Sequence, residues 1–348
     1  MASTLLTSAQ DIFRKDDSFA GFKDIVAEFP PRSRLISARP LGISTWTNTT
    51  RLSVEHPDGK EKVYFLKCAQ SEDGRVLVQG EFNSMSEIYA TAPGFVPKPY
   101  TWGTCYLDDT EAYFFISEFI DFSGRLPEPD RLWGKLADLH QTSVSPTGKF
   151  GFHVTTCQGR TAQSVPWERS WTVFFSKLLA HVVSLDAKTN GPWGNFEILA
   201  RRCVEAVIPR LIGALERDGR KVKPCLIHGD LWEGNTGTSL ETGDIYVFDS
   251  AAFYVHNEME TGNWRCHYNN IHDPGKNYGA ALGQHLKIEG QRSTPRRALT
   301  LTIAHPSIGM HGPENTYGEQ VATWAALSTS TSLEGAMCEV AHNRRREA

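Results

Sequence analysis

The sequence predicts an α+β fold with two lobes, a small β-rich N-terminal lobe and a mainly α C-terminal lobe. Three observations support this class. Apolar residues alternate as in strands over 35–69, they recur at helical spacing in most of 132–218, and short apolar runs return around a polar loop at 226–250. We expect a helical lead at residues 1–34 and a first lobe at residues 35–120. A second lobe is expected at residues 121–270, followed by an atypical C-terminal segment at residues 271–348.

Composition limits the classes of protein and partner. The 348 residues are enough for two lobes, and 40% hydrophobic with 22% charged residues is ordinary for a globular chain. The net charge of -4 gives no reason to expect a nucleic-acid partner. No apolar stretch approaches the ~20 residues of a membrane span, and residues 1–15 lack the apolar centre of a secretory signal. We therefore expect a cytoplasmic protein without membrane contact.

The cysteines predict neither a disulfide framework nor a zinc site. They are odd in number and none stands in a CxxC pair, which is typical of reduced thiols. They are Cys68, Cys105, Cys157, Cys203, Cys225, Cys266 and Cys338.

The first lobe begins with a helical pattern and continues in strands. Apolar residues recur at loosely helical intervals over 1–30. Strand patterns follow at 35–39, 46–54 and 63–67. Turns are expected between them, at Pro40–Gly42 and at the Asp58-Gly59 pair, which favours a hairpin.

Lys67 stands at the end of the third apolar strand. A cation there can reach the α- and β-phosphates of a nucleotide if a carboxylate holds its ammonium group in place. The candidate carboxylate is Glu81, on a predicted helix whose apolar positions include Phe82 and Met85, and Glu87 on the same helix is an alternative. On the residues alone, Lys67 is also open to interpretation as a solvated surface charge.

Two loops of this lobe are candidates for contacts with a nucleotide. The turn Gly42–Trp46 precedes two strands, and Ser44 within it has a hydroxyl and an amide to offer a phosphate, although a plain turn explains the same letters. The apolar strand over 113–121 leads into the connection between the lobes. Its backbone groups at Glu118, Phe119 and Ile120 are our candidates for the adenine edge, and a core strand with its exit loop is the alternative.

Helical patterns dominate the second lobe. Leu132, Leu136 and Leu139 mark an amphipathic helix that ends near His140. A second apolar pattern covers 167–182, and a third covers 196–218 with a break near Pro209.

The polar loop at 226–250 carries the residues that point to chemistry. Asp230 and Asn235 lie five positions apart, and Asp249 ends the strand pattern 245–248. Phosphoryl transfer needs one carboxylate to orient and deprotonate the accepting hydroxyl, and an amide and a second carboxylate to hold magnesium on the ATP phosphates. The alternative is a hairpin rich in Asn, Asp and Gly whose polar side chains only cap turns.

Residues 226–235 resemble the catalytic loop of the fructosamine-3-kinase (ketosamine kinase) family, within the aminoglycoside-phosphotransferase group of protein-kinase-like folds. Three further stretches resemble that family's own signatures, in the family's order: Phe150–Gly159, Trp167–Phe175 and Asp249–Glu258. The resemblance covers about residues 35–270. It implies the two-lobed protein-kinase-like fold.

The resemblance also implies an activity and a set of roles. Members of the family use ATP with Mg²⁺ to phosphorylate the 3-hydroxyl of ketosamines, either small molecules or adducts on lysines of glycated proteins, and the product then falls apart and frees the amine. By this resemblance, Asp230 is the catalytic base, Asn235 and Asp249 bind Mg²⁺, and Lys67 with Glu81 holds the ATP phosphates. We favour ribulosamine over fructosamine because activity on it is the wider property of the family.

Two further residues have roles that the resemblance suggests and simpler explanations that compete with them. Trp232 is the family's tryptophan in the catalytic loop and is a candidate stacking face for the substrate; the alternative is an aromatic that fills the interface between the lobes. His153 lies in the FGFH run and is a candidate for the sugar pocket; the alternative is a hydrogen-bonded loop histidine. His256 and Glu258 are expected to be structural.

The resemblance stops after Ile271. The remaining residues have poor periodicity and end in a basic run, and we hypothesise an altered reading frame or a missed splice junction there. Two other functions stay open: a small-molecule kinase of the aminoglycoside or choline type, and a catalytically inactive kinase-like binding module.

Overall fold

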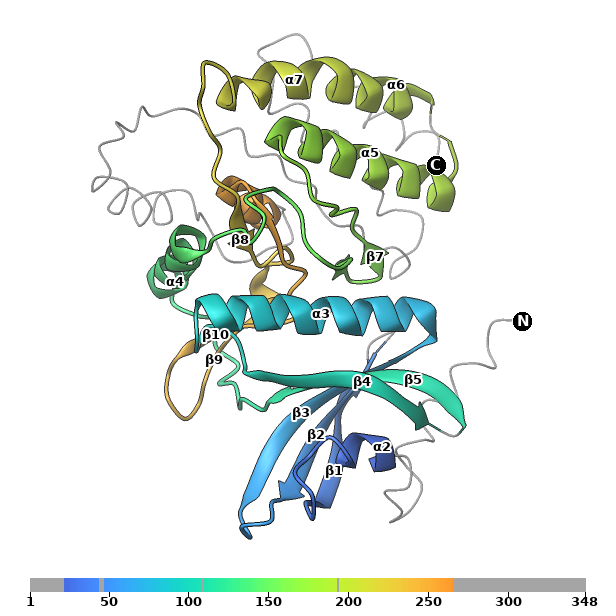
Figure 1. Ribbon diagram of the computed structural model, residues 1–348, viewed down its shortest axis with the longest axis vertical. Helices are drawn as coiled ribbons and strands as arrows, with labels where there is room; N and C mark the ends of the chain where they lie inside the picture. The colour runs from blue at the N-terminus through green and yellow to red at the C-terminus, as the bar shows by residue number, and fades with distance from the viewer. Residues whose placement is uncertain (1–21, 44–46, 108, 193, 266–348) are drawn as a thin grey trace.

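A computed structural model describes residues 22–43, 47–107, 109–192 and 194–265. The described part forms two lobes joined at residues 119–128, after the last strand of the first lobe and before the first helix of the second (Figure 1). Most of the expected helical lead at 1–34 and the whole segment 271–348 lie outside the described residues.

The first lobe is built on an antiparallel sheet whose five strands are ordered β1-β2-β3-β5-β4. The strands are β1 (Arg34–Ile43), β2 (Asn48–Glu55), β3 (Glu61–Gln70), β4 (Pro99–Leu107) and β5 (Thr110–Glu118). The turn predicted at Pro40–Gly42 is wrong, because these residues continue β1 across an irregularity in its register with β2. Pro40 is tolerated there because β1 is an edge strand, where a missing N–H need not interrupt a ladder.

Different elements cover the two faces of this sheet. The short helix α2 (Lys23–Val26) places Ile25 in the outer core with Leu52, Leu66 and Phe114. The long helix α3 (Ser71–Thr91) covers the inner face and lies across the middle of the molecule, between the sheet and the second lobe (Figure 1). Because α3 packs against the sheet on one side and against the second lobe on the other, its position depends on both lobes.

The second lobe is mainly helical, as expected. Its helical segments are α4 (Pro129–Thr142), α5 (Trp171–Asn190), α6 (Gly194–Arg202), a π-helical turn (Cys203–Val207), α7 (Ile208–Leu211) and a 3₁₀ turn (Gly213–Leu215). The break predicted near Pro209 is the π turn that immediately precedes α7. Proline lacks an N–H and crowds the carbonyl four residues back, so the widened turn lies where the regular helix cannot continue.

Three short strand pairs complete the second lobe. β8 (Cys225–Ile227) pairs with β11 (Phe253–Val255), β9 (Thr236–Thr238) with β10 (Ile245–Val247), and β6 (Cys157–Gln158) with β7 (Thr161–Ala162). The β9–β10 hairpin is preceded by a 3₁₀ turn (Glu233–Asn235), and β11 is followed by another (Asn257–Arg265). These pairs place residues 228–235 and 248–260 side by side.

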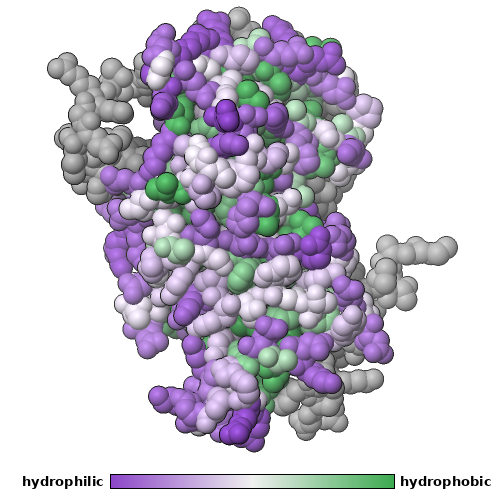
Figure 2. Space-filling view, in the orientation of Figure 1, coloured by the Kyte–Doolittle hydropathy of each residue, from purple (hydrophilic) through white to green (hydrophobic). Residues whose placement is uncertain are grey.

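Hydrophobic side chains are gathered inside rather than on the surface. One core runs from Val78, Met85 and Phe115 of the first lobe to Leu136 and Phe253 of the second. The face shown in Figure 2 is mainly hydrophilic, with hydrophobic residues scattered over it. Within the described residues, no helix is long and apolar enough to cross a membrane.

Candidate active site

Lys67 is the centre of a charged group that joins the two lobes. Its Nζ lies 2.9 and 2.8 Å from the two carboxylate oxygens of Glu81 on α3, and 2.6 Å from Oδ1 of Asp249 in the second lobe. Lys67 and Glu81 are buried, whereas 46% of the Asp249 side chain is exposed. Asp249 therefore keeps an open side on which a further cation can bind.

The charges of this group follow from burial and from mutual attraction. Burial acts to lower the pKa of Lys67, but Asp249 and Glu81 outweigh it and raise that pKa above its ordinary value. Partial loss of hydration acts to raise the pKa of Asp249, but Lys67 outweighs it and lowers that pKa. For Glu81, burial raises the pKa against the opposing effect of Lys67. Asp249 is therefore the firmer anion of the two carboxylates.

Asp230 and Asn235 are joined at the start of the β9–β10 hairpin. The Asn235 Nδ2 donates to the Asp230 carbonyl at 2.8 Å and lies 3.4 Å from Asp230 Oδ2. Loss of hydration, and then the nearby Asp249, raise the pKa of Asp230 well above its ordinary value. The backbone N–H of Phe248 donates to the Asn235 carbonyl at 3.0 Å, which connects the loop that carries Asp230 to the strand end that carries Asp249.

Gly229 allows these two loops to approach. Its φ is +81°, and a Cβ at this position would collide with the Ala251 carbonyl. The Ala251 N–H donates to the His228 carbonyl at 2.9 Å in the same place. A side chain at residue 229 would therefore push Asp230 away from the segment that follows Asp249.

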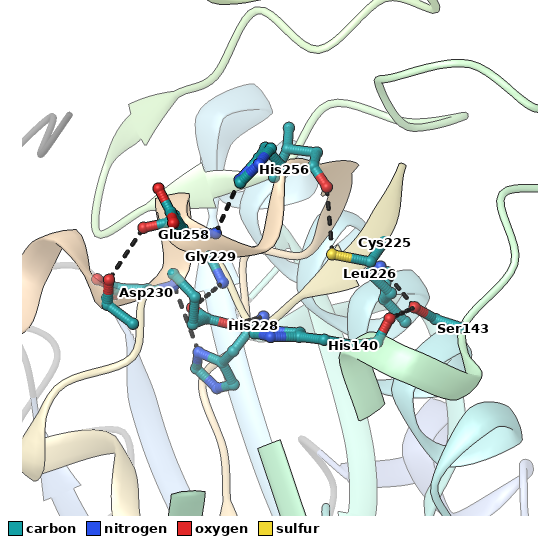
Figure 3. Close-up of polar contacts among 12 residues, drawn as sticks. His140, Ser143, Cys225, Leu226, His228, Gly229, Asp230, His256 and Glu258 are labelled. Carbon is teal, nitrogen blue, oxygen red and sulfur yellow. Dashed lines mark hydrogen bonds and ion pairs between the residues drawn. The ribbon is translucent and has the colours of Figure 1, made fainter. Parts of the chain in front are cut away.

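His228 fixes the distance between the same two loops with its ring. Its Nε2 lies 2.9 Å from the Phe248 carbonyl, and its Nδ1 accepts the Asp230 N–H at 3.3 Å. These two contacts require the proton on Nε2, and burial lowers the pKa of His228, so the ring is neutral. Figure 3 shows this ring below Gly229 and Asp230.

Glu260 is a buried acid that we did not predict from the sequence. Its carboxylate accepts the backbone N–H groups of His228 and Gly229, the latter at 3.1 Å, and lies 3.4 Å from Nε2 of His140 on α4. Only 3% of Glu260 is exposed. It therefore holds the turn from which Asp230 projects. The sequence gives no signal for this role, because the partners are backbone amides that carry no residue-specific pattern.

The predicted adenine contacts lie at the end of β5. The Glu118 N–H donates to the Lys98 carbonyl at 2.8 Å, so this amide is engaged within the sheet and is not free for an adenine ring. Phe119 lies below the Arg51 guanidinium, 5.2 Å from ring centroid to Cζ, and Ile120 follows it. The contacts of Glu118 through its carbonyl, and of Phe119 and Ile120, with a nucleotide stay predictions. Ser44 lies outside the described residues.

Trp232 and His153 occupy different places. Trp232 is 37% exposed and its ring lies over Gly234. His153 is exposed, and its Nε2 lies 2.9 Å from Oδ1 of Asn83 on α3. The roles of both residues toward a substrate stay predictions.

Glu87 is not an alternative partner for Lys67. Its carboxylate accepts the hydroxyl of Tyr254 at 2.6 Å, which corrects the sequence-based alternative. The reason is helical geometry, since Glu87 lies six residues beyond Glu81 and faces β11 instead of β3. Tyr254 was also not predicted as a site residue.

Comparison with known proteins relates the chain to kinases of ketosamines. A family model described as fructosamine kinase matches residues 45–272. The chain is 32% identical over 204 residues to the protein named protein-ribulosamine 3-kinase, chloroplastic, of Oryza sativa subsp. indica, which covers 58% of this chain and 56% of the rice protein. It is 27% identical over 221 residues to the ketosamine-3-kinase of Mus musculus, covering 56% of this chain and 67% of the mouse protein. The aligned part spans little more than half of the rice relative.

Comparison with solved structures supports the fold. A protein named as a fructosamine-3-kinase from Thermobifida fusca superposes with a TM-score of 0.58 at 16% sequence identity, covering 93% of this chain and 98% of that chain. The predicted two-lobed α+β fold of the protein-kinase-like class is confirmed.

Proposed function

The chain belongs to the fructosamine kinase family, and we propose that it transfers the γ-phosphoryl group of ATP to the 3-hydroxyl of a ketosamine. Ribulosamine is the preferred substrate in this proposal and fructosamine the second. We propose that the protein phosphorylates these ketosamines both as small molecules and as adducts on lysines of glycated proteins. Phosphorylation of the protein adducts would lead to deglycation. The cytoplasmic location stays a prediction.

One observation carries the proposal. Lys67 of the first lobe lies between Glu81 and Asp249, and Asp249 is connected through Phe248 and Asn235 to Asp230. The residues that we propose as the phosphate-binding cation, the two oxygen ligands and the base therefore come together from positions that are far apart in the sequence. An inactive binding module has no need of this complete set, and the family membership favours a ketosamine over an aminoglycoside or choline as the acceptor.

The donor atoms fit a magnesium ion bound to ATP. Asn235 uses its Nδ2 for Asp230, which leaves its Oδ1 for a cation, and Asp249 is half-exposed. Hard cations prefer such oxygen ligands. We propose that Asn235 and Asp249 hold Mg²⁺, which neutralises phosphate charge when bound, and that Lys67 binds the α- and β-phosphates.

Asp230 then acts on the acceptor. The substrate hydroxyl passes its proton to the Asp230 carboxylate as its oxygen bonds to the γ-phosphorus, and the bond from that phosphorus to the bridging oxygen breaks to release ADP. The transition state is loose, so the positions of these residues supply most of the acceleration. A 3-phosphate is a good leaving group for β-elimination, which frees the amine from the product.

Incubation of the protein with Mg-ATP and ribulosyl-lysine or fructosyl-lysine, with ADP release as the readout, tests the proposal. We expect turnover, and a loss of roughly 10²- to 10⁴-fold in Asp230→Asn with the affinity for Mg-ADP retained. Absence of turnover by a folded protein that binds ADP would favour the binding module. Turnover only on other alcohols would favour the aminoglycoside or choline class.

A further inference from the structure

Helix α3, which carries Glu81, is attached to the second lobe by hydrogen bonds. Oγ of Ser84 accepts the backbone N–H of Ala252 at 2.9 Å, and the hydroxyl of Tyr254 donates to Oε1 of Glu87 at 2.6 Å. Ser84 and Tyr254 are both buried, at 0% and 1% exposure. Both partners of α3, Ala252 and Tyr254, follow Asp249 within five residues. The same short stretch of chain therefore carries the metal-binding carboxylate and the attachment of the helix that orients Lys67.

The close approach at Gly80 strengthens this attachment. A Cβ on Gly80 would lie 2.7 Å from the Thr155 carbonyl oxygen and 3.1 Å from the Thr156 Cα, so α3 touches the backbone of the second lobe one residue before Glu81. A rotation of α3 that carried Glu81 away from Lys67 would break this contact and both hydrogen bonds. The first lobe alone does not determine where Glu81 lies.

We propose that Tyr254 and Ser84 are positioning residues, which fix α3 on the segment after Asp249 and so hold Glu81, Lys67 and Asp249 in one arrangement before a nucleotide binds. The proposal rests on the proposed function only in taking this group as the nucleotide site. It assigns the two residues no contact with the acceptor. Their loss should therefore weaken nucleotide binding and leave the affinity for the acceptor unchanged.

The contribution of Tyr254 can be separated from its packing. Its ring lies 6.4 Å from the Phe152 ring and 6.2 Å from the Trp167 ring, centroid to centroid, and a phenylalanine keeps both neighbours. Burial, and then the hydrogen bond to Glu87, raise the pKa of Tyr254, so the hydroxyl stays protonated and remains a donor. Tyr254→Phe therefore removes one hydrogen bond and little else.

The experiment compares Tyr254→Phe, Glu87→Ala and their combination with a matched control. We expect each single variant to bind Mg-ADP about three- to tenfold more weakly in a calorimetric titration. The combined variant should bind no more weakly than either, because the two changes remove the same bond. Glu87→Gln keeps an acceptor oxygen and should bind as the wild type does. Without nucleotide, hydrogen exchange of the amides in residues 79–91 should be faster in Tyr254→Phe.

Tyr113→Phe is the control, because Tyr113 also donates its hydroxyl to a glutamate, Glu111, on its own strand in the first lobe. It should leave both the Mg-ADP affinity and the exchange of 79–91 unchanged. If Tyr254→Phe lowers the melting temperature but changes neither the Mg-ADP affinity nor the hydrogen exchange of residues 79–91, Tyr254 is only a packing residue and the proposal is wrong. A rise in the KM for the acceptor with unchanged nucleotide affinity would also overturn it. Because ADP binding and exchange need no acceptor, they decide the matter even if the protein phosphorylates no ketosamine.

Discussion

Glu260 shows at the scale of one residue how the turn before Asp230 is held. Its carboxylate serves two backbone donors, and a glutamine of the same shape has one oxygen and one NH₂ group. In Glu260→Gln, the NH₂ group would face one of the two N–H groups and displace Asp230. We expect kcat to fall roughly 10- to 100-fold, since small misplacements of a reacting group have effects of that size.

The control for this variant is Asp186→Asn. Asp186 is another buried acid, on α5, where it accepts the amide of Asn190 at 2.8 Å. The Asp186→Asn variant should be less stable than the wild type but should keep the same kcat per folded molecule. Equal effects of both substitutions on kcat would show that Glu260 has no special relation to the loop that carries Asp230.

His256 makes the stability of the protein depend on pH. Burial, and then the neighbouring His140, lower the pKa of His256 to about 4. In the unfolded chain, the His256 ring takes up a proton once the pH falls below its ordinary pKa of about 6.5, whereas in the folded protein the ring does not. The stability due to the neutral ring is therefore complete above about pH 6.5 and is lost as the pH falls toward about 4.

This difference of about 2.5 pKa units corresponds to about 3 kcal/mol between the two limits. Between pH 6.5 and 4.5, we expect the free energy of unfolding of the wild type to fall by about 2 to 3 kcal/mol more than that of His256→Asn. Urea unfolding curves at the two pH values measure it. Equal losses in variant and wild type would contradict the assignment to this ring.

Helix α5 begins on a carboxylate from another element. Glu216 accepts the backbone N–H groups of Trp171 and Thr172, at 2.8 and 3.0 Å, and the hydroxyl of Ser170 at 2.9 Å. Burial alone would raise the pKa of Glu216, but hydrogen bonds, those from Thr172 first, lower it. An anion at a helix N-terminus also interacts favourably with the helix dipole.

Removal of this cap should destabilise the second lobe. We expect Glu216→Ala to reduce the free energy of unfolding by about 1 to 3 kcal/mol, because unpaired amide groups are left at the start of α5. Thermal unfolding followed by circular dichroism measures the change. Glu205→Ala, at an exposed position of the π turn, is the control and should be within about 0.5 kcal/mol of the wild type.

The elements that the sequence predicted well are those with a long and regular apolar pattern. α3, α4 and α5 have such patterns, and so do β2 and β3 on either side of the Asp58-Gly59 turn. β4 was not predicted, because its letters mix glycine, threonine and aromatic residues and it is stabilised by pairing with β5. Pro40 misled the prediction for β1, because the sequence does not show which strand will be at an edge.

At the scale of the whole molecule, the two lobes share one hydrophobic core through α3. Val78 and Met85 on this helix belong to the same cluster as Leu136 and Phe253 of the second lobe. Lys135 on α4 adds polar contacts at the junction, since its Nζ lies 3.1 Å from the carbonyls of both Gly94 and Ile245. The first lobe has a second core of its own around Leu66 and Phe114, but the core that contains Val78 and Met85 is buried only when both lobes are present.

We therefore expect the lobes to unfold together. In urea, the transitions followed by tryptophan fluorescence and by far-ultraviolet circular dichroism should coincide. Tryptophans in both lobes, such as Trp102 and Trp171, report on both. Two separate midpoints would show that the shared core does not couple the lobes.

The candidate site was partly predictable for a physical reason. The side chains that we propose to act on a ligand have chemistry that the sequence displays, so Lys67, Glu81, Asp230, Asn235 and Asp249 could be proposed, and the structure brings them together. Glu260, His228 and Tyr254 act on backbone groups or on other side chains across the fold. Such partners become visible only when the distant segments are placed next to each other.

The position of Lys67 between two carboxylates also governs the order in which ligands can arrive. Before a nucleotide is present, its ammonium occupies an oxygen of Asp249, so a free divalent ion would have to displace a positive group from that carboxylate. In the proposed function, a nucleotide would offer Lys67 phosphate oxygens in exchange and would release Asp249 at the same moment. We expect the metal to enter together with the nucleotide, and to be held poorly when it comes alone.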